Sequence, residues 1–453
     1  FAETRFEEYH SAELLCQTLE QEGFTVEKGL AGMETAFVAS YGSGGPIVAI
    51  LGEYDALSGL SQQRGQSVHT PVEAGGNGHG CGHNLLGTGS LAAAVAIRHY
   101  LEENQLNGTV RYYGCPAEEG GSGKTFMARE GLFDNVDFAL CWHPQNINAI
   151  MSVSSLANYQ VYFRFKGKAA HAAAAPHLGR SALDAVELMN VGVNYLREHV
   201  IPEARMHYAI TQTGGLAPNV VQAEAEVLYL IRAPKTPQVE EIYQRICKVA
   251  QGAAMMTETE VEIVFDKACS NLIPNQTLER VMYDNFRELG VPQFDEAEIE
   301  LARQIRMTMT EADKNSDLQL LAKLKGPGVN ELLNKLKEME LSNFLLPHLQ
   351  TPLPLPGSTD VGDVSWITPT VQCSTTCFAM GTQLHSWQAV SQGGMSIGQK
   401  GMLHAGKVMA ATAIDVLMRP EIVAQAKAEL LERLSGQSYV CPIPAEIKPA
   451  ARR

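Results

Sequence analysis

Short apolar runs alternate with helical patterns over the first third of the chain. Three segments have the length and composition of buried strands: Pro46–Leu51, Gly108–Gly114 and Asp137–Trp142. Three others have the apolar spacing of helices: Arg5–Glu22, Asn84–Glu103 and Lys124–Phe133. Strands that alternate with helices predict a mostly parallel α/β sheet, in which ligands collect at the carboxyl ends of the strands.

The pattern changes at about residue 156. Four strands with alternating apolar and polar positions are predicted: Asn158–Lys168, Met206–Thr213, Val220–Ala233 and Glu260–Lys267. Two helices accompany them: Ser181–His199 and Pro237–Met256. The order β-α-β-β-α-β is that of a ferredoxin-like unit. We therefore expect residues 156–268 to form a small α+β domain inserted into a larger one that comprises residues 1–155 and 269–453.

Periodicity is weaker in the last part of the chain. Helices are predicted over Leu278–Leu289, Leu301–Met309, Lys323–Glu340 and Gly401–Met418, and a short strand over Thr375–Met380. The pattern assigns no role to residues 290–350.

Composition narrows the class of protein. The chain has 453 residues and a net charge of −15, which argues against a nucleic-acid or anionic-membrane partner. No apolar run approaches the ~20 residues that span a bilayer. The nine cysteines are scattered and form no CxxC pair, so a reducing cytoplasm is favoured over a disulfide framework.

Candidate chemistry begins in the glycine-rich loop Gly75–Asn84, which contains His79, Cys81 and His83. Thiolate and imidazole are common ligands of zinc and similar metals. Cys81 and His83 would face the same side if this segment were an extended strand. The alternative is a glycine-rich turn with a buried cysteine and two solvated histidines.

Further candidate ligands follow predicted strands. Glu118 and Glu119 come after the predicted strand Gly108–Gly114. If the two residues continued this strand, their side chains would point to opposite sides. One carboxylate could then bind a metal ion while the other acts on a water molecule. The alternative is a solvated acidic turn at the start of a helix. His143 and His385 are each predicted to end a strand, although either could be a structural histidine. These residues, with Cys81 and His83, supply about the number of ligands that two metal ions need.

A nucleotide site is a competing interpretation of the segment Gly120–Thr125, GGSGKT. The phosphate-binding loop pattern requires glycine where Glu118 stands, and a carboxylate there would repel phosphate. We therefore expect these glycines to give a tight entry to the following helix.

Seven motifs occur in a familiar order along the chain: GEYDAL, HGCGHN, CPAEEG, WHP, KGKAAHAAAAPHLGRSALDA, GGLAPNVVQAEAEV and TQLHSW. As a set they resemble the M20 metallopeptidases, and within them the amidohydrolase branch that includes aminoacylase-like and indole-acetyl-amino-acid hydrolases. The resemblance implies a mixed-sheet domain that binds two metals, with an inserted ferredoxin-like lid or dimerisation domain.

The resemblance also implies roles for matching residues. Glu118 would be the general base and acid. Five residues would bind the metals, with Cys81 as the bridge: Cys81, His83, Glu119, His143 and His385. His171 would reach the active site of a partner chain. Other residues expected near the substrate are Asn219, Arg232, Ser358 and Thr359.

Two departures from the family pattern are informative. Other M20 branches carry a His-x-Asp motif where this chain has Glu53-Tyr54-Asp55, so one histidine ligand is lost and His83 is expected to replace it. Asp55 would then orient a ligand. Asn84 stands where many relatives have aspartate. No ligand role is expected for His79, His177 or His404.

The activity implied is hydrolysis of the amide between an acyl or aroyl group and an amino acid, with p-aminobenzoyl-glutamate as the expected substrate. The expected cofactors are two divalent ions per chain, zinc or manganese. The expected assembly is a homodimer, or a heterodimer with a second, homologous subunit. The alternative is a non-catalytic or partner-dependent subunit.

Overall fold

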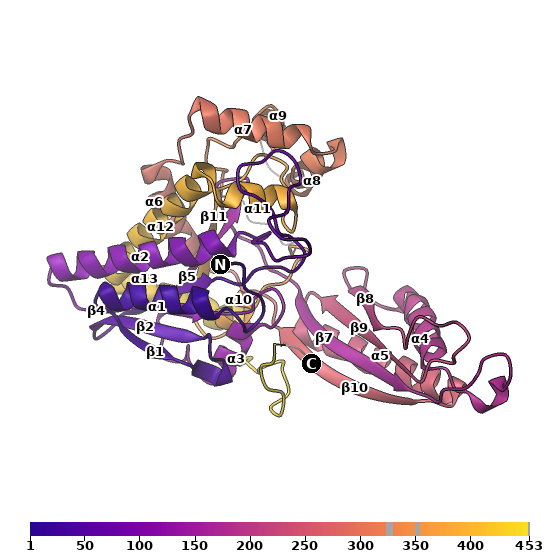
Figure 1. The fold of residues 1–453 in the computed structure, drawn as a ribbon. Coiled ribbons are helices and arrows are strands. Elements are labelled where there is room, and N and C mark those ends of the chain that lie inside the picture. The colour runs from indigo at the N-terminus through magenta and orange to yellow at the C-terminus, as the bar shows by residue number, and fades with distance from the viewer. Residues whose placement is uncertain (323–328, 349–353, 452–453) are drawn as a thin grey trace.

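The computed structural model describes residues 1–322, 329–348 and 354–451. Two sheets organise them, a seven-stranded sheet with the order β1-β2-β4-β3-β5-β11-β6 and a four-stranded sheet with the order β10-β7-β9-β8. Figure 1 shows the larger sheet within a helical body and the smaller sheet projecting from one side of that body.

The seven-stranded sheet is mixed. Its strands are β1 (Thr25–Lys28), β2 (Phe37–Ser43), β3 (Ile47–Glu53), β4 (Gly108–Cys115), β5 (Phe138–Gln145), β6 (Ala149–Ile150) and β11 (Thr370–Thr376). The central strands β4, β3, β5 and β11 are mutually parallel, whereas β1, β2 and β6 join in antiparallel pairs. Helices cover both faces of the central strands, which explains the continuous apolar run of β3.

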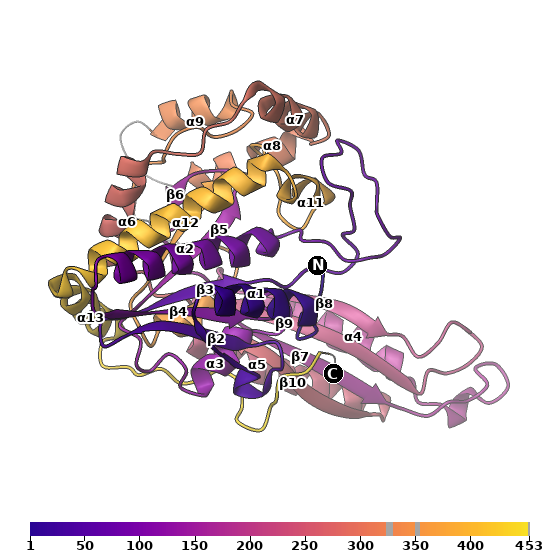
Figure 2. The same cartoon turned by 60° about the vertical axis from the view of Figure 1, so that its left-hand side comes forward.

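One face of this sheet packs against α2 (His83–Glu103) and α12 (Ser396–Leu417). The other face packs against α3 (Gly123–Arg129) and α10 (Val361–Ser365). Figure 2 shows α2 and α12 on one side of the sheet and α3 on the other. Glycine permits the close approach of the first pair, because a Cβ on Gly406 would lie 3.0 Å from the carbonyl oxygen of Gly89. The remaining helices of the body are α1 (Tyr9–Gln21), α6 (Gln276–Leu289), α7 (Glu296–Met307), α8 (Glu311–Leu321), α9 (Val329–Lys337), α11 (Trp387–Gly393) and α13 (Pro420–Leu434).

The four-stranded sheet belongs to the inserted unit, a name used here for the elements from β7 to β10. They are β7 (Ala157–Lys166), α4 (Ala182–Leu196), β8 (Arg205–Gln212), β9 (Glu224–Ala233), α5 (Thr236–Thr257) and β10 (Glu260–Cys269). Their order and strand pairing confirm the ferredoxin-like prediction. One face packs on α4 and α5 through Val161, Phe163 and Phe165, and β8 is an exposed edge strand.

Several predicted boundaries were wrong for identifiable reasons. The late strand is β11, not Thr375–Met380, because its polar side chains are buried and internally bonded; the Thr375 hydroxyl, for example, donates to the carbonyl of Gly401. The first helix starts at Tyr9, since Arg5 instead turns inward to pair with Asp266. The helix from Lys124 ends at Arg129. Of the helix predicted over 323–340, residues 323–328 lie outside the described residues.

Within the described ranges, none of the helices combines the length and apolarity needed to cross a bilayer. The nine cysteines are all free thiols.

Candidate metal centre

The carboxyl ends of three neighbouring parallel strands bring the candidate residues together. Glu53 ends β3 and is paired in register with Cys115 at the end of β4, and His143 lies near the end of β5. The turn after β4 carries Glu118 and Glu119, and the long loop after β3 returns at the start of α2. The predicted location at the strand ends is therefore confirmed for these residues.

All five predicted metal ligands converge. The side chains of Cys81, His83 and His143 offer ligand atoms within 4.8 Å of one another, and so do those of Cys81, Glu119 and His385. Cys81 belongs to both groups. A ligand shared by two neighbouring metal ions would have to occupy such a position.

Hydrogen bonds turn two histidines toward this cluster. Nδ1 of His83 lies 2.8 Å from Oδ1 of Asp55, and Nδ1 of His143 lies 2.9 Å from the carbonyl oxygen of Pro144. In each ring the Nδ1–H donates, which leaves the Nε2 lone pair facing the cluster. Nε2 of His143 lies 3.4 Å from Sγ of Cys81.

Two segments of the site do not have strand geometry, and the expectation that His385 ends a strand was wrong. Cys81 and His83 do not lie on a strand, because Gly82 between them has φ +81° and His83 begins α2. His385 does not end a strand; it lies in a loop beyond β11, with φ +60°, and its side chain is exposed. The two loops bring these side chains together where strand geometry would not.

Glu119 is anchored at both ends. Its backbone N–H donates to Oδ2 of Asp55 over 3.0 Å, and its Oε1 lies 2.9 Å from Nε2 of His385. Burial alone would raise the pKa of Glu119, but the bonds to His385 and the charge of His83 outweigh it and lower the pKa to about 2. Asp55 therefore positions two candidate ligands, His83 and Glu119.

Glu118 points to a different part of the site. The backbone of Ala117 has φ +57°, so the two glutamates diverge because of a turn and not because of strand alternation. The ligand atoms of Glu118, Glu53 and His83 lie within 4.8 Å of one another. Burial, followed by the negative charges of Glu53, Asp360 and Glu119, raises the pKa of Glu118 well above its usual range. A carboxyl group in such surroundings is well suited to hold a proton.

The charges at the site fit divalent cations. Five carboxylates gather there: Glu53, Asp55, Glu118, Glu119 and Asp360. Within the described residues, Lys124 is the only lysine or arginine that forms an ion pair with any of them. In addition, Nε2 of the fully buried His83 has no hydrogen-bond partner. Buried negative charge and converging lone pairs are stabilised when metal ions bind.

Lys124 also argues against a nucleotide site. Its side chain is completely buried, and Nζ lies 2.6 Å from Oε1 of Glu53 and 2.6 Å from Oδ1 of Asp360. An ammonium group held in this way is not available to a phosphate.

The predicted substrate residues fall into two places. Arg232 is the next-to-last residue of β9 and pairs with Asn158 near the start of β7. Its buried Nε has no partner. Burial lowers the pKa of Arg232, while the nearby charges of Glu118 and Glu119 act in the opposite direction. The Ser358 hydroxyl is also buried without a partner, and the Thr359 hydroxyl accepts from the N–H of Val361.

His171 and Asn219 lie at the other end of the inserted unit, in the loops that follow β7 and β8. Because β7 has ten residues, these loops are roughly 30 Å from the Arg232 end of the sheet. Both side chains are exposed. One chain therefore does not bring His171 and Asn219 to its own cluster.

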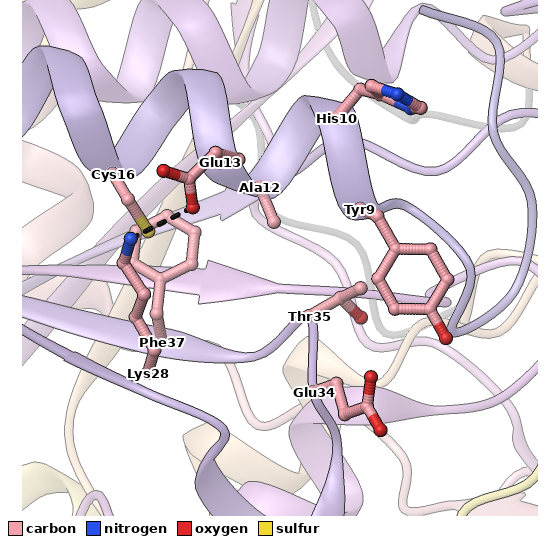
Figure 3. Close-up of a pocket in the computed structure, with 9 residues that line it drawn as sticks. All are labelled: Tyr9, His10, Ala12, Glu13, Cys16, Lys28, Glu34, Thr35 and Phe37. Carbon is pink, nitrogen blue, oxygen red and sulfur yellow. Dashed lines mark hydrogen bonds and ion pairs between the residues drawn. The ribbon is translucent and has the colours of Figure 1, made fainter.

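The three unassigned histidines lie elsewhere. His79 contacts the carbonyl of Phe1, His177 is exposed, and His404 packs against Phe286 between α6 and α12. A surface hollow of about 410 Å³ beside α1, shown in Figure 3, contains Cys16 and the ion pair between Glu13 and Lys28. None of its lining residues belongs to the metal cluster.

Sequence reasoning missed the roles of Glu53, Lys124 and Asp360 in this site. The signal for Glu53 was present, since a carboxylate that ends a buried strand requires a partner. No local signal joins Lys124 to Asp360. Lys267 was also missed; its Nζ donates to the carbonyl of Glu119 over 2.9 Å.

Glu8 gives the fold a testable dependence on pH. Its carboxylate accepts the N–H groups of Phe6 and Ala117 and the hydroxyl of Thr35, and burial together with Asp55 raises its pKa to about 8. The unfolded chain ionises at lower pH, so the stability associated with protonated Glu8 is lost as pH rises from about 4 to about 8. We expect the stability of Glu8→Gln relative to the natural chain to rise by about 3 kcal/mol between pH 5.5 and pH 8.5.

Urea unfolding of the metal-free proteins at both pH values measures this gain. Glu7→Gln, on the neighbouring exposed residue, should show no pH-dependent difference. A stability difference for Glu8→Gln that is the same at both pH values would contradict the interpretation.

The fold and the site together define a metal-dependent hydrolase of the mixed α/β type. The chain belongs to peptidase family M20/M25/M40, whose profile matches residues 49–322. It is 53% identical to the B subunit of p-aminobenzoyl-glutamate hydrolase from Escherichia coli (strain K12), over 99% of this chain and 93% of that protein.

Two further similarities extend this result. The A subunit of p-aminobenzoyl-glutamate hydrolase from the same strain is 30% identical over 50% of this chain and 54% of that protein. A related structure is that of a Bacillus subtilis protein described as a dinuclear metal binding peptidase of the M20 family. The TM-score is 0.55 at 16% sequence identity, and the match covers 92% of this chain and 95% of that one. The latter similarity supports the fold alone.

Proposed function

We propose that this protein is a metal-dependent amidohydrolase that cleaves the amide between an acyl or aroyl group and an amino acid, with p-aminobenzoyl-glutamate as substrate. The observation that supports this most directly is the carboxyl group of Glu118 beside the ligand cluster centred on Cys81. The 53% identity to the B subunit of the Escherichia coli hydrolase supports the choice of substrate.

The residues that would hold two divalent ions are Cys81 as the shared ligand, His83 and His143 on one side, and Glu119 and His385 on the other. When bound, the ions would supply positive charge that acidifies a water molecule and polarises the amide carbonyl. The thiolate of Cys81 favours zinc, whereas carboxylate and imidazole ligands also suit manganese.

Glu118 is proposed as the general base and acid. Its carboxylate would take a proton from the attacking water and hold it at one oxygen. The proton would then pass to the amide nitrogen as the bond to the carbonyl carbon breaks, so that a neutral amine leaves. The negative surroundings of Glu118 favour its protonated form and support the second half of this exchange.

Arg232 is proposed to bind the carboxylate of the amino-acid part of the substrate, since its buried Nε is without a partner. Ser358 and Thr359 are proposed to line the same region. We expect Arg232→Met to raise KM about 10- to 100-fold with a smaller change in kcat, because a hydrogen bond to a charged group contributes about 1.5–3 kcal/mol. Initial rates over a range of substrate concentrations measure both constants, and an unchanged KM would remove Arg232 from this role.

The inserted unit, with proposed borders at residues 156 and 268, would act as the lid and dimerisation domain. The exposed edge strand β8 offers unpaired backbone groups to a second sheet. His171 and Asn219 would then reach the cluster of the partner chain. We propose a homodimer or a heterodimer with a second, homologous subunit, in keeping with the similarity to both subunits of the Escherichia coli hydrolase. A cytoplasmic location fits the nine free thiols.

The deciding experiment uses the purified chain alone. After metals are removed with a chelator, we expect added zinc or manganese to restore release of p-aminobenzoate from p-aminobenzoyl-glutamate. A panel of N-acyl amino acids tests the substrate class, and sedimentation of the same sample gives the oligomeric state. Activity that requires the homologous second subunit would favour the alternative, in which this chain depends on a partner. A chain that binds metal but is inactive with that partner present would overturn the proposal.

A further inference from the structure

Glu53 has two carboxylate oxygens in two different environments. Oε1 lies 2.6 Å from Nζ of Lys124, whereas Oε2 lies 3.2 Å from Nε2 of His83. The residue is 2% exposed. Thus one oxygen is neutralised by a lysine, and the other faces the candidate metal centre.

The contact between Glu53 and His83 requires a positive charge between the two side chains. Nδ1–H of His83 already donates to Asp55, so its Nε2 presents a lone pair to Oε2 of Glu53. A lone pair and a carboxylate oxygen at 3.2 Å repel each other unless a proton or a metal ion lies between them. Nε2 of His83 has no hydrogen-bond partner although the side chain is fully buried.

A third side chain, that of Glu118, lies beside this pair. The ligand atoms of Glu53, His83 and Glu118 all lie within 4.8 Å of one another. This third group shares His83 with the group of Cys81 and His143, so the same ion could touch ligands of both groups. Glu53 therefore lies where an additional ligand would be.

Lys124 and Asp360 fix the orientation of Glu53. Nζ of Lys124 bonds to both carboxylates, and the backbone N–H of Lys124 donates to Oδ2 of Asp360 over 2.9 Å. All three side chains are buried. Because Lys124 engages only Oε1 of Glu53, Oε2 is left directed at the centre.

We propose that Glu53 is itself a metal ligand, on the His83 side of the centre, and that Lys124 and Asp360 form the clamp that presents it. The expected site then has six protein ligands in place of five. This inference rests on the proposed metal-dependent function and adds a ligand at the position where the family motif has lost a histidine.

The test measures zinc content by elemental analysis and zinc affinity by competition with a chelator, neither of which depends on catalysis. We expect the natural chain to hold two ions. Glu53→Gln should hold one ion tightly and bind the second at least 10-fold more weakly. Asp360→Asn is the matched control, because it removes the same charge from the same lysine but no oxygen facing the centre. It loosens the clamp and keeps the proposed ligand, so it should weaken the second ion less than Glu53→Gln does.

Three outcomes separate the possibilities. Equal losses in Glu53→Gln and Asp360→Asn would show that only the clamp's charge matters and would overturn the ligand assignment. Two tightly bound ions in Glu53→Gln would overturn it as well, while leaving the proposed function intact. A natural chain that holds neither zinc nor manganese by elemental analysis would overturn the proposed function itself. Thermal unfolding of the metal-free variants identifies any loss of fold, and Glu53→Asp, which retains the charge and a donor oxygen, should recover part of the lost affinity.

Discussion

Replacement of Glu118 by glutamine is expected to lower kcat by about 10²–10⁴-fold while both metal ions remain bound. Glutamine has nearly the same shape as glutamate, but it can neither accept the proton of water nor return one to the amine. The ligand groups that include Cys81 do not require Glu118, so metal content should be unchanged. Steady-state rates and elemental analysis of the same preparation measure the two effects.

The neighbouring residue provides the control. Glu119→Gln removes a carboxylate that lies within 4.8 Å of the ligand atoms of both Cys81 and His385, so this variant should lose metal together with activity. The two substitutions remove the same charge one residue apart, and the turn at Ala117 separates their consequences. Near-natural turnover by Glu118→Gln with both ions bound would refute the assignment of the general base.

The sequence was sufficient to predict which residues after buried strands come together at the site. Glu118 and Glu119 follow β4, and His143 lies near the end of β5. Both strands are largely buried, and parallel strands bring their carboxyl ends to one edge of the sheet. The ferredoxin-like order of the inserted unit was equally accessible, because the alternation on its strands reflects one face packed on helices.

Other parts depend on tertiary contacts that leave no local pattern. β11 is buried along its whole length but rich in threonine and serine, so its hydroxyl groups rather than its hydrophobicity determine its place. The loop that holds His385 is supported by residues outside it; the side chain of Gln383, for example, bonds to Ser316 in α8. Helix α8, from a part of the chain to which the sequence assigned no role, thus helps to place a candidate metal ligand.

The clearest case of a long-range contact is the buried group formed by Glu53, Lys124 and Asp360, which come from β3, α3 and the segment before α10. Lys124 and Asp360 are 236 positions apart in the chain. The glycine-rich segment around Lys124 resembles a phosphate loop, yet its lysine neutralises two carboxylates of the protein itself. The same residue type serves a different purpose because the surrounding fold is already anionic.

This arrangement predicts a large loss of stability when the lysine is removed. Lys124→Met keeps most of the side-chain volume but leaves Glu53 and Asp360 buried with no lysine between them. Breaking a buried ion pair by removing one partner costs about 3–5 kcal/mol. We expect a loss of this size in the free energy of unfolding of the metal-free protein, measured by urea denaturation.

A second substitution separates charge from packing. If unpaired charge causes the loss, the double variant Lys124→Met with Asp360→Asn should be about 1–2 kcal/mol more stable than Lys124→Met alone. The second substitution removes one of the two unpaired carboxylates. It keeps an acceptor for the backbone N–H of residue 124. Lys407→Met, on the exposed side of α12, should change stability by no more than about 0.5 kcal/mol. A free energy of unfolding for Lys124→Met within about 1 kcal/mol of the natural chain would contradict the charge-pairing role of this lysine. Loss of the cation between two buried carboxylates should cost more than that.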